Sequence, residues 1–147
     1  MIVAKTFYEL NNQELYQILR LRSEVFVVEQ DCVYQDLDNK DQISIHIFQK
    51  EKDEIVAYTR IFKSGDYYKN PSIGRVVVSK KNRGKELGKK IMIHSIEYIK
   101  KNLEGEKIEL SAQKYLDKFY KDLGFYKIGE DYLEDGIPHQ RMIKEIN

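Results

Sequence analysis

Cysteine is nearly absent from this chain of 147 residues, because Cys32 is the only one. A single cysteine excludes an internal disulfide, and its acidic neighbour Asp31 disfavours the thiolate that a nucleophile would need. No apolar run approaches the length of a membrane-spanning helix, and the N-terminus lacks the layout of a signal peptide. We therefore expect a cytoplasmic protein in a reducing compartment, with no membrane partner.

An excess of one charge is also missing, since 25 Lys and Arg residues face 24 Asp and Glu residues, a net charge of +1. This balance argues against bulk electrostatic binding of nucleic acid. The charges are nevertheless unevenly placed: residues 29–41 carry five acids and one Lys, and residues 79–90 carry six basic residues and only one acid. Separated patches of opposite sign suit an anionic cofactor at one place and a cationic substrate at another.

The basic segment 79–90 follows a β-branched run and precedes a helical pattern, with glycines at Gly84 and Gly88. Neither GxxxxGK[ST] nor GxGxxG is present, which excludes a P-loop and a dinucleotide fingerprint. Glycines let a backbone approach a ligand, and the N–H groups and dipole of a helix start favour an anion. The segment therefore predicts a site for another phosphate-bearing ligand, the alternative being a solvated basic surface.

Periodicity predicts one domain over residues 1–147, with helices packed on a mixed α/β sheet. Helical spacing covers 11–30, 84–102 and 116–123, although residues 25–28 fit a helix end or extended chain equally well. Strand patterns cover 42–49, 55–62, 72–78, 107–111, 125–133 and 139–146, and the first two read as an antiparallel hairpin. The predicted order is α-β-β-β-α-β-α-β-β, after a possible N-terminal strand.

Two motifs resemble those of the GNAT superfamily of acyl-CoA N-acyltransferases. The first, Arg83-Gly84-Lys85-Glu86-Leu87-Gly88, is similar to the superfamily loop Arg/Gln-x-x-Gly-x-Gly/Ala, with Glu86 in place of the central glycine. The second is Phe119-Tyr120 followed by Gly124-Phe125. Together with the stretches 21–30, 74–77, 111–113 and 134–139, these motifs resemble the ElaA-type group over nearly the whole chain. The resemblance implies a largely antiparallel central sheet flanked by helices.

The resemblance also implies an activity, namely transfer of an acetyl group from acetyl-CoA to a primary amine by direct attack in a ternary complex, without a metal. Loop N–H groups and the charges of Arg83 and Lys85 would bind the CoA pyrophosphate, and Val76–Val78 would lie beside the pantetheine arm. The full set of expected cofactor-binding residues is Val76, Val77, Val78, Arg83, Gly84, Lys85, Glu86, Leu87, Gly88, Gln113 and Tyr120.

Two residues are the expected catalysts. A phenol has a pKa of about 10, so Tyr120 can donate a proton to the departing thiolate, the alternative being a structural tyrosine. Glu29 follows the apolar run Val25–Val28, which would desolvate its carboxylate and raise its pKa toward that of a general base. The nearby aspartates, His46 and His139 are alternative bases.

Other functions stay open at this stage. A CoA-binding sensor without turnover would use the same phosphate-binding loop but would need no general base. Acyl-homoserine-lactone synthases transfer to a different acceptor and share an element similar to residues 22–26. The expected partner is a small-molecule or peptide amine rather than nucleic acid, and the chain would act as a monomer or homodimer.

Overall fold

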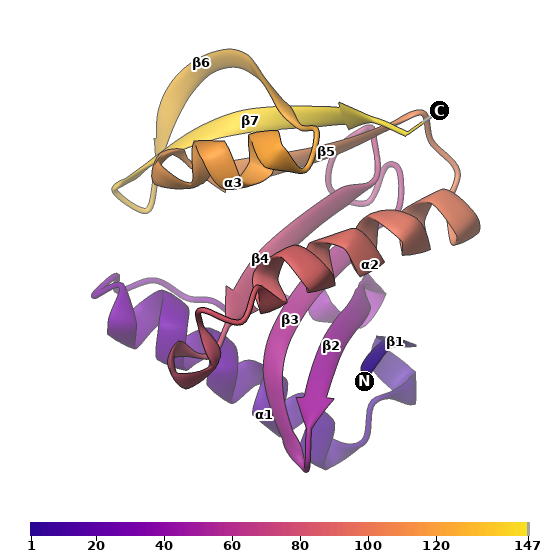
Figure 1. The fold of residues 1–147 in the computed structure, drawn as a ribbon, viewed down its shortest axis with the longest axis vertical. Helices are drawn as coiled ribbons and strands as arrows, with labels where there is room; N and C mark the ends of the chain where they lie inside the picture. The colour runs from indigo at the N-terminus through magenta and orange to yellow at the C-terminus, as the bar shows by residue number, and fades with distance from the viewer. Residues whose placement is uncertain (147) are drawn as a thin grey trace.

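One mixed sheet organises the computed structural model, which describes residues 1–146 (Figure 1). Its seven strands are β1 (Ile2–Thr6), β2 (Ile45–Glu51), β3 (Glu54–Phe62), β4 (Ser72–Val78), β5 (Lys107–Gln113), β6 (Tyr126–Glu134) and β7 (Ile137–Glu145). The α-helices are α1 (Asn12–Arg22), α2 (Leu87–Asn102) and α3 (Asp117–Asp122). This order confirms the predicted fold, including the N-terminal strand.

Helix α1 begins where the sequence places its cap. The Asn11 side chain accepts a hydrogen bond from the Glu14 N–H at 2.8 Å, and the Glu14 carboxylate accepts one from the Asn11 N–H at 3.0 Å. Beyond Arg22 the chain continues as a π-helix, η2 (Ser23–Glu29), so the ambiguous residues 25–28 are helical. Residues Val25, Phe26 and Glu29 of this π-helix line the cleft described below.

The sheet order is β1-β2-β3-β4-β5-β7-β6, and every neighbouring pair is antiparallel except β4 and β5. These two parallel strands pair at Ser72 and Glu109 and then diverge, as Figure 1 shows. The sheet is therefore open along its middle, with β1–β4 on one side and β5–β7 on the other.

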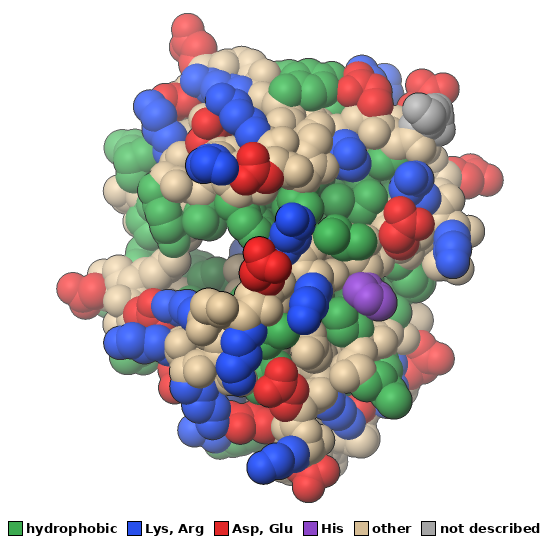
Figure 2. Space-filling view, viewed as in Figure 1, with side chains coloured by type: hydrophobic (Ala, Val, Ile, Leu, Met, Phe, Trp, Pro, Cys, Tyr) green, Lys and Arg blue, Asp and Glu red, His purple; other side chains and the backbone are tan. Residues whose placement is uncertain are grey.

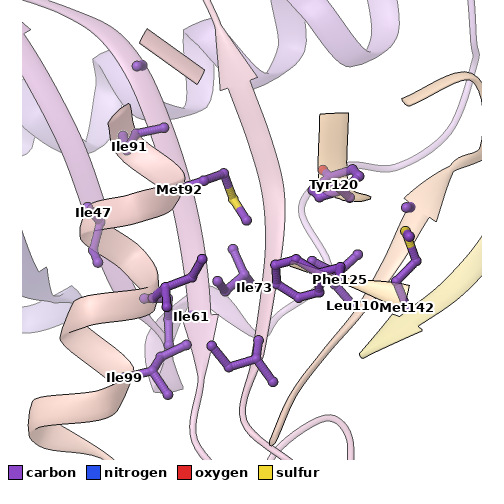
Figure 3. Packing of buried hydrophobic residues seen from close by; sticks show 14 of the residues in the cluster. Ile47, Ile61, Ile73, Ile91, Met92, Ile99, Leu110, Tyr120, Phe125 and Met142 are labelled. Atoms are coloured by element: carbon purple, nitrogen blue, oxygen red, sulfur yellow. The ribbon is translucent and has the colours of Figure 1, made fainter. Parts of the chain in front are cut away.

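Two apolar cores cover the two faces of the sheet. Helices α2 and α3 pack on one face, where Ile91, Met92 and Tyr120 join β-strand side chains (Figure 3). Helix α1 covers the other face of β2–β4 through Ile18 and Leu21. The first core spans both halves of the sheet, which holds them at a fixed divergence.

Candidate active site

The divergence of β4 and β5 creates a cleft of about 860 Å³. In Figure 2 the molecule is hollowed at the left, between the C-terminal half above and the rest below, and hydrophobic side chains line the upper rim. The walls come from β4, the end of β5, the start of α2, helix α3 and segment 29–40. A cleft of this size can hold an extended thioester arm together with a second substrate.

A β-bulge lies in β4 beside this cleft. Arg75 has φ +49°, and the pairing with β3 shifts between Tyr58–Val77 and Arg60–Gly74, so β4 carries one extra residue there. Past the bulge, the Val78 carbonyl faces the cleft, where it accepts hydrogen bonds from the Arg83 guanidinium. Since alternate backbone groups of a strand point to opposite sides, the end of β4 presents N–H and C=O groups to a ligand.

The predicted phosphate loop leads into α2 with two left-handed residues. Gly84 has φ +86°, a conformation that glycine adopts without strain, and Glu86 has φ +59° at the N-cap. The Glu86 side chain is exposed and makes no capping hydrogen bond. The N–H groups of the first turn of α2 therefore stay open to an anion, and the substituted glycine does not turn a carboxylate toward them.

Tyr120 lines the cleft from α3 although only 5% of its surface is exposed. Its ring makes edge-on contacts with Phe119 and Phe125, at centroid distances of 5.0 and 6.0 Å. Burial raises the pKa of its phenol, so the hydroxyl is protonated at neutral pH. A buried, protonated hydroxyl at the wall of a cleft can act as a proton donor.

Residues 6–146 match the family described as the acetyltransferase (GNAT) domain. The chain belongs to the GNAT family. It is 43% identical to the protein ElaA of Escherichia coli over 140 residues, which cover 94% of this chain and 92% of ElaA. The crystal structure of E. coli ElaA superposes with a TM-score of 0.92 at 39% identity, covering 99% of both chains.

Two further GNAT structures are similar. An acyl-CoA N-acyltransferase from Pseudomonas aeruginosa has a TM-score of 0.90 at 36% identity and covers 98% of this chain and 99% of its own. An aminoglycoside 6′-N-acetyltransferase complexed with coenzyme A shares the fold, with a TM-score of 0.73 at 15% identity, and covers 97% of this chain and 96% of its own.

Glu29 lines the cleft between β4 and β5, but the pKa of its carboxyl group is shifted in the direction opposite to the prediction. The Arg83 guanidinium donates to both Glu29 carboxylate oxygens, at 2.5 and 2.9 Å. This pair holds the pKa of Glu29 below its ordinary value, so the predicted rise was wrong. The preceding run fails to desolvate Glu29 because Val28 is itself exposed. The Arg83 side chain is also drawn to the Val78 carbonyl, so its guanidinium is shared between Glu29 and β4.

The acidic segment 29–41 does not form an open patch for a cationic substrate, as the sequence had suggested. Three of its aspartates form ion pairs with three arginines, through the pairs Arg22–Asp36, Arg22–Asp41, Arg60–Asp38, Arg60–Asp41 and Arg75–Asp36. Burial by itself would raise the pKa of Asp38, but hydrogen bonds from Arg60 more than offset it and lower that pKa to about 2. The network fixes the loop between η2 and β2, and it neutralises the carboxylates of Asp36, Asp38 and Asp41.

His46 belongs to the same network rather than to the cleft. Its Nδ1 lies 2.6 Å from the Tyr58 hydroxyl and its Nε2 lies 2.9 Å from the Asp41 carbonyl. The side chain is fully buried, and this burial lowers its pKa. Both ring nitrogens are engaged, so His46 is a structural residue.

Segment 29–32 makes three long-range contacts along one side of the cleft. Besides the Glu29–Arg83 pair, the Gln30 and Gln113 side-chain amides exchange hydrogen bonds at 3.2 and 3.4 Å. The Cys32 thiol donates to the Asp135 carbonyl at 3.3 Å. The predicted cofactor residue Gln113 therefore lies at the cleft, where it joins the end of η2 to the end of β5.

Sequence reasoning missed other cleft residues. The bulge at Arg75 could not be predicted from the sequence. It requires a left-handed backbone, which a residue other than glycine adopts mainly where tertiary contacts impose it. Ser111, Glu134 and His139 come from three different strands and meet only because of the sheet register. His139 was considered as a base, but its partners were not recognisable from local sequence.

Proposed function

We propose that this protein is an acetyl-CoA-dependent N-acetyltransferase that acetylates a primary amine by direct attack within a ternary complex. The observation that carries the proposal is the cleft between β4 and β5, which brings the β4 bulge, the open start of α2 and the buried Tyr120 hydroxyl to one place. Two of the similar proteins described above, an acyl-CoA N-acyltransferase and an acetyltransferase complexed with coenzyme A, support the use of this thioester.

The start of α2 fits the pyrophosphate of CoA. Its first-turn N–H groups have no capping side chain, and Lys80, Lys85 and Lys89 are close to them in the sequence. In this proposal the N–H groups of residues 84–88 donate to the phosphate oxygens, and the lysines add long-range attraction. The Arg83 side chain contributes once it exchanges Glu29 for phosphate, because both are anionic partners of similar geometry.

The β4 backbone serves the pantetheine arm and the reacting carbonyl. Residues Val76–Val78 follow the bulge and offer N–H and C=O groups along the cleft. An N–H group of this strand polarises the thioester carbonyl, as an oxyanion hole does. Tyr120 then donates its proton to the thiolate, whose charge develops only as the C–S bond breaks.

The acceptor is a small-molecule or peptide amine that enters from the side of β4 and β5 opposite α3. A CoA-binding sensor remains the second reading, and it differs from the enzyme in needing no proton donor at the thiolate. The buried hydroxyl of Tyr120 in the cleft favours the enzyme. The self-association state, monomer or homodimer, remains a prediction.

A consumption assay tests this function. The purified protein is mixed with acetyl-CoA and each of a panel of polyamines, amino acids, aminoglycosides and peptides, and free thiol is measured. We expect thiol release with at least one amine, together with an acetylated product identified by mass. If acetyl-CoA raises the melting temperature but no amine releases thiol, the sensor reading replaces the enzyme. If acetyl-CoA at millimolar concentration neither raises the melting temperature nor releases thiol with any amine, the enzyme and the sensor hypotheses are both wrong.

A further inference from the structure

The face of β5, β7 and β6 turned away from α3 carries a row of polar side chains. Sheet register places Gln113 opposite His139, and His139 opposite Tyr132, so these three side chains share one face. Their neighbours Leu110, Ala112 and Met142 point the other way, into the core under α2 and α3. The polar row therefore lies on the face of the sheet opposite α3, and Gln113 and His139 of this row line the cleft.

His139 has one ring nitrogen fixed as a donor. Its Nδ1 lies 2.7 Å from the Ile137 carbonyl, and because a carbonyl oxygen only accepts, the proton of the neutral ring is on Nδ1. The lone pair is then on Nε2, which lies 3.4 Å from Oε2 of Glu134. The ring stacks on Tyr132, with centroids 6.1 Å apart and planes inclined by 28°. His139 is thus held in one orientation with Nε2 beside the Glu134 carboxylate, and in the neutral ring Nε2 is the proton acceptor.

Glu134 is the exposed partner of this pair. Its side chain is 46% exposed, against 7% for that of His139, and both residues line the cleft. Its Oε1 lies 3.4 Å from the Ser111 hydroxyl, which also contacts the Tyr132 hydroxyl. No Lys or Arg of residues 1–146 forms an ion pair with Glu134, in contrast to Glu29 and Asp38. The carboxylate is therefore available to a cationic group in the cleft.

We propose that Glu134 holds the ammonium group of the acceptor and that His139 Nε2 takes its proton. This assignment rests on the proposed acetyl transfer. One N–H bond of the ammonium breaks as the Nε2–H bond forms, and the freed electron pair on nitrogen attacks the thioester carbonyl. The resulting imidazolium lies against the Glu134 carboxylate, which stabilises its charge. As the C–S bond breaks, the attacking nitrogen loses its second proton to solvent, Tyr120 protonates the departing thiolate, and solvent reprotonates Tyr120. His46 is unsuited to this role, because it is enclosed by Tyr58 and Asp41. Glu29 is paired with Arg83 in the absence of CoA, and its substitution tests whether it competes with His139 as the base.

Two acceptors that share a benzyl group and differ in the basicity of the reacting nitrogen separate proton removal from structural support. Phenethylamine is protonated at neutral pH and must lose a proton, whereas phenylacetic hydrazide is already neutral. His139→Asn keeps a side-chain N–H that can reach the Ile137 carbonyl but lacks Nε2. We expect this variant to lose turnover of phenethylamine by about 10²-fold or more while its turnover of the hydrazide is little changed. Glu134→Gln should raise the KM for phenethylamine more than the KM for the hydrazide.

His94→Asn is the matched control, since His94 is exposed on α2 and should leave both rates unchanged. Equal losses with both acceptors in His139→Asn would overturn the assignment and mark His139 as structural. A wild type that turns over neither acceptor nor any amine of the panel would contradict the proposed function instead.

A binding measurement tests the same geometry without turnover. In the presence of CoA, phenethylamine should shift the imidazole Cε1–H proton resonance of His139, identified as the signal missing from His139→Asn. The shift should disappear in Glu134→Gln. An unshifted His139 resonance at saturating amine would overturn the proposal.

Discussion

Tyr120 combines burial with access to the cleft, and its substitution by phenylalanine removes only the hydroxyl. The ring contacts with Phe119 and Phe125 would persist, so the fold should survive. If the hydroxyl protonates the thiolate, its contribution arises in the transition state, and kcat should fall by about 10²–10⁴-fold while acetyl-CoA binds nearly normally. Steady-state kinetics and calorimetric titration measure the two effects. Joint loss of acetyl-CoA affinity and thermal stability would identify Tyr120 as a packing residue.

Glu29 and Arg83 make a second prediction at this scale. Glu29→Gln removes the carboxylate that competes for the Arg83 guanidinium, so acetyl-CoA should bind more tightly. The gain should be at most about fivefold, because exposed ion pairs contribute about 1 kcal/mol or less. The salt dependence of binding should steepen, since Arg83 then meets phosphate. Calorimetry at two ionic strengths measures both effects, and Glu24→Gln, an exposed acid on the same π-helix, is the control. A 10²-fold loss of kcat with unchanged affinity would instead restore Glu29 as the base.

At the scale of the elements, a substitution at the start of α2 should affect acetyl-CoA affinity without lowering the stability of the fold. A methyl group on Gly88 would lie 3.6 Å from the Phe119 ring and 3.7 Å from Val78, which are ordinary contacts. Gly88→Ala should therefore leave the melting temperature unchanged or raise it, since alanine favours a helix by about 1 kcal/mol. The same methyl group narrows the approach to the N–H groups of the first turn, so acetyl-CoA affinity should fall. Wild-type affinity in this variant would place the pyrophosphate elsewhere.

Sequence patterns predicted most elements because they depend on neighbouring residues. The alternation of Ile45 and Ile47 gave β2, and the Asn11 cap gave the start of α1. The π-helix was not predictable, because residues 25–28 have no local preference that selects a wider turn. The strand predicted to begin at residue 42 begins at Ile45, since Asp41–Ile43 forms a 3-10 turn.

At the scale of the whole molecule, the sequence predicted site residues in contiguous motifs but not contacts between residues that are distant in the sequence. The loop Arg83–Gly88 and Tyr120 were predictable as site candidates because their motifs are contiguous, and Arg83, Gly88 and Tyr120 line the cleft. The aspartates of segment 29–41 were misassigned to an open patch because their partners Arg22, Arg60 and Arg75 are distant in sequence. The His139–Glu134 pair was missed for a related reason, since a hairpin turn and side-chain orientation bring the two groups together.

Acid should destabilise the whole molecule over a defined range. Burial alone would raise the pKa of Glu14, but the Asn11 N–H and the ammonium groups of Lys50 and Lys5 lower it to about 2, and Asp38 has a similar value. The unfolded chain, with ordinary values of 4.5 and 3.8, takes up these protons first. Stability is therefore complete above about pH 5 and falls as the pH drops toward about 2.

Urea unfolding midpoints measured at several pH values test whether stability falls as the pH drops. Glu14→Gln should flatten the decline by removing one of the two carboxylates, whereas the exposed Glu97→Gln on α2 should not. A midpoint that stays constant between about pH 6 and pH 3 would contradict the ion-pair account.

The divergence of β4 and β5 has a consequence beyond catalysis. Past Ser72 and Glu109, each strand carries a row of backbone groups that the other does not bind. Inside one folded molecule this makes two strand edges, and such edges recruit β-strands from other chains during aggregation. The amides of a pantetheine arm would cover one of these edges as an added strand does. We therefore expect the proposed cofactor to slow aggregation as well as to supply an acetyl group.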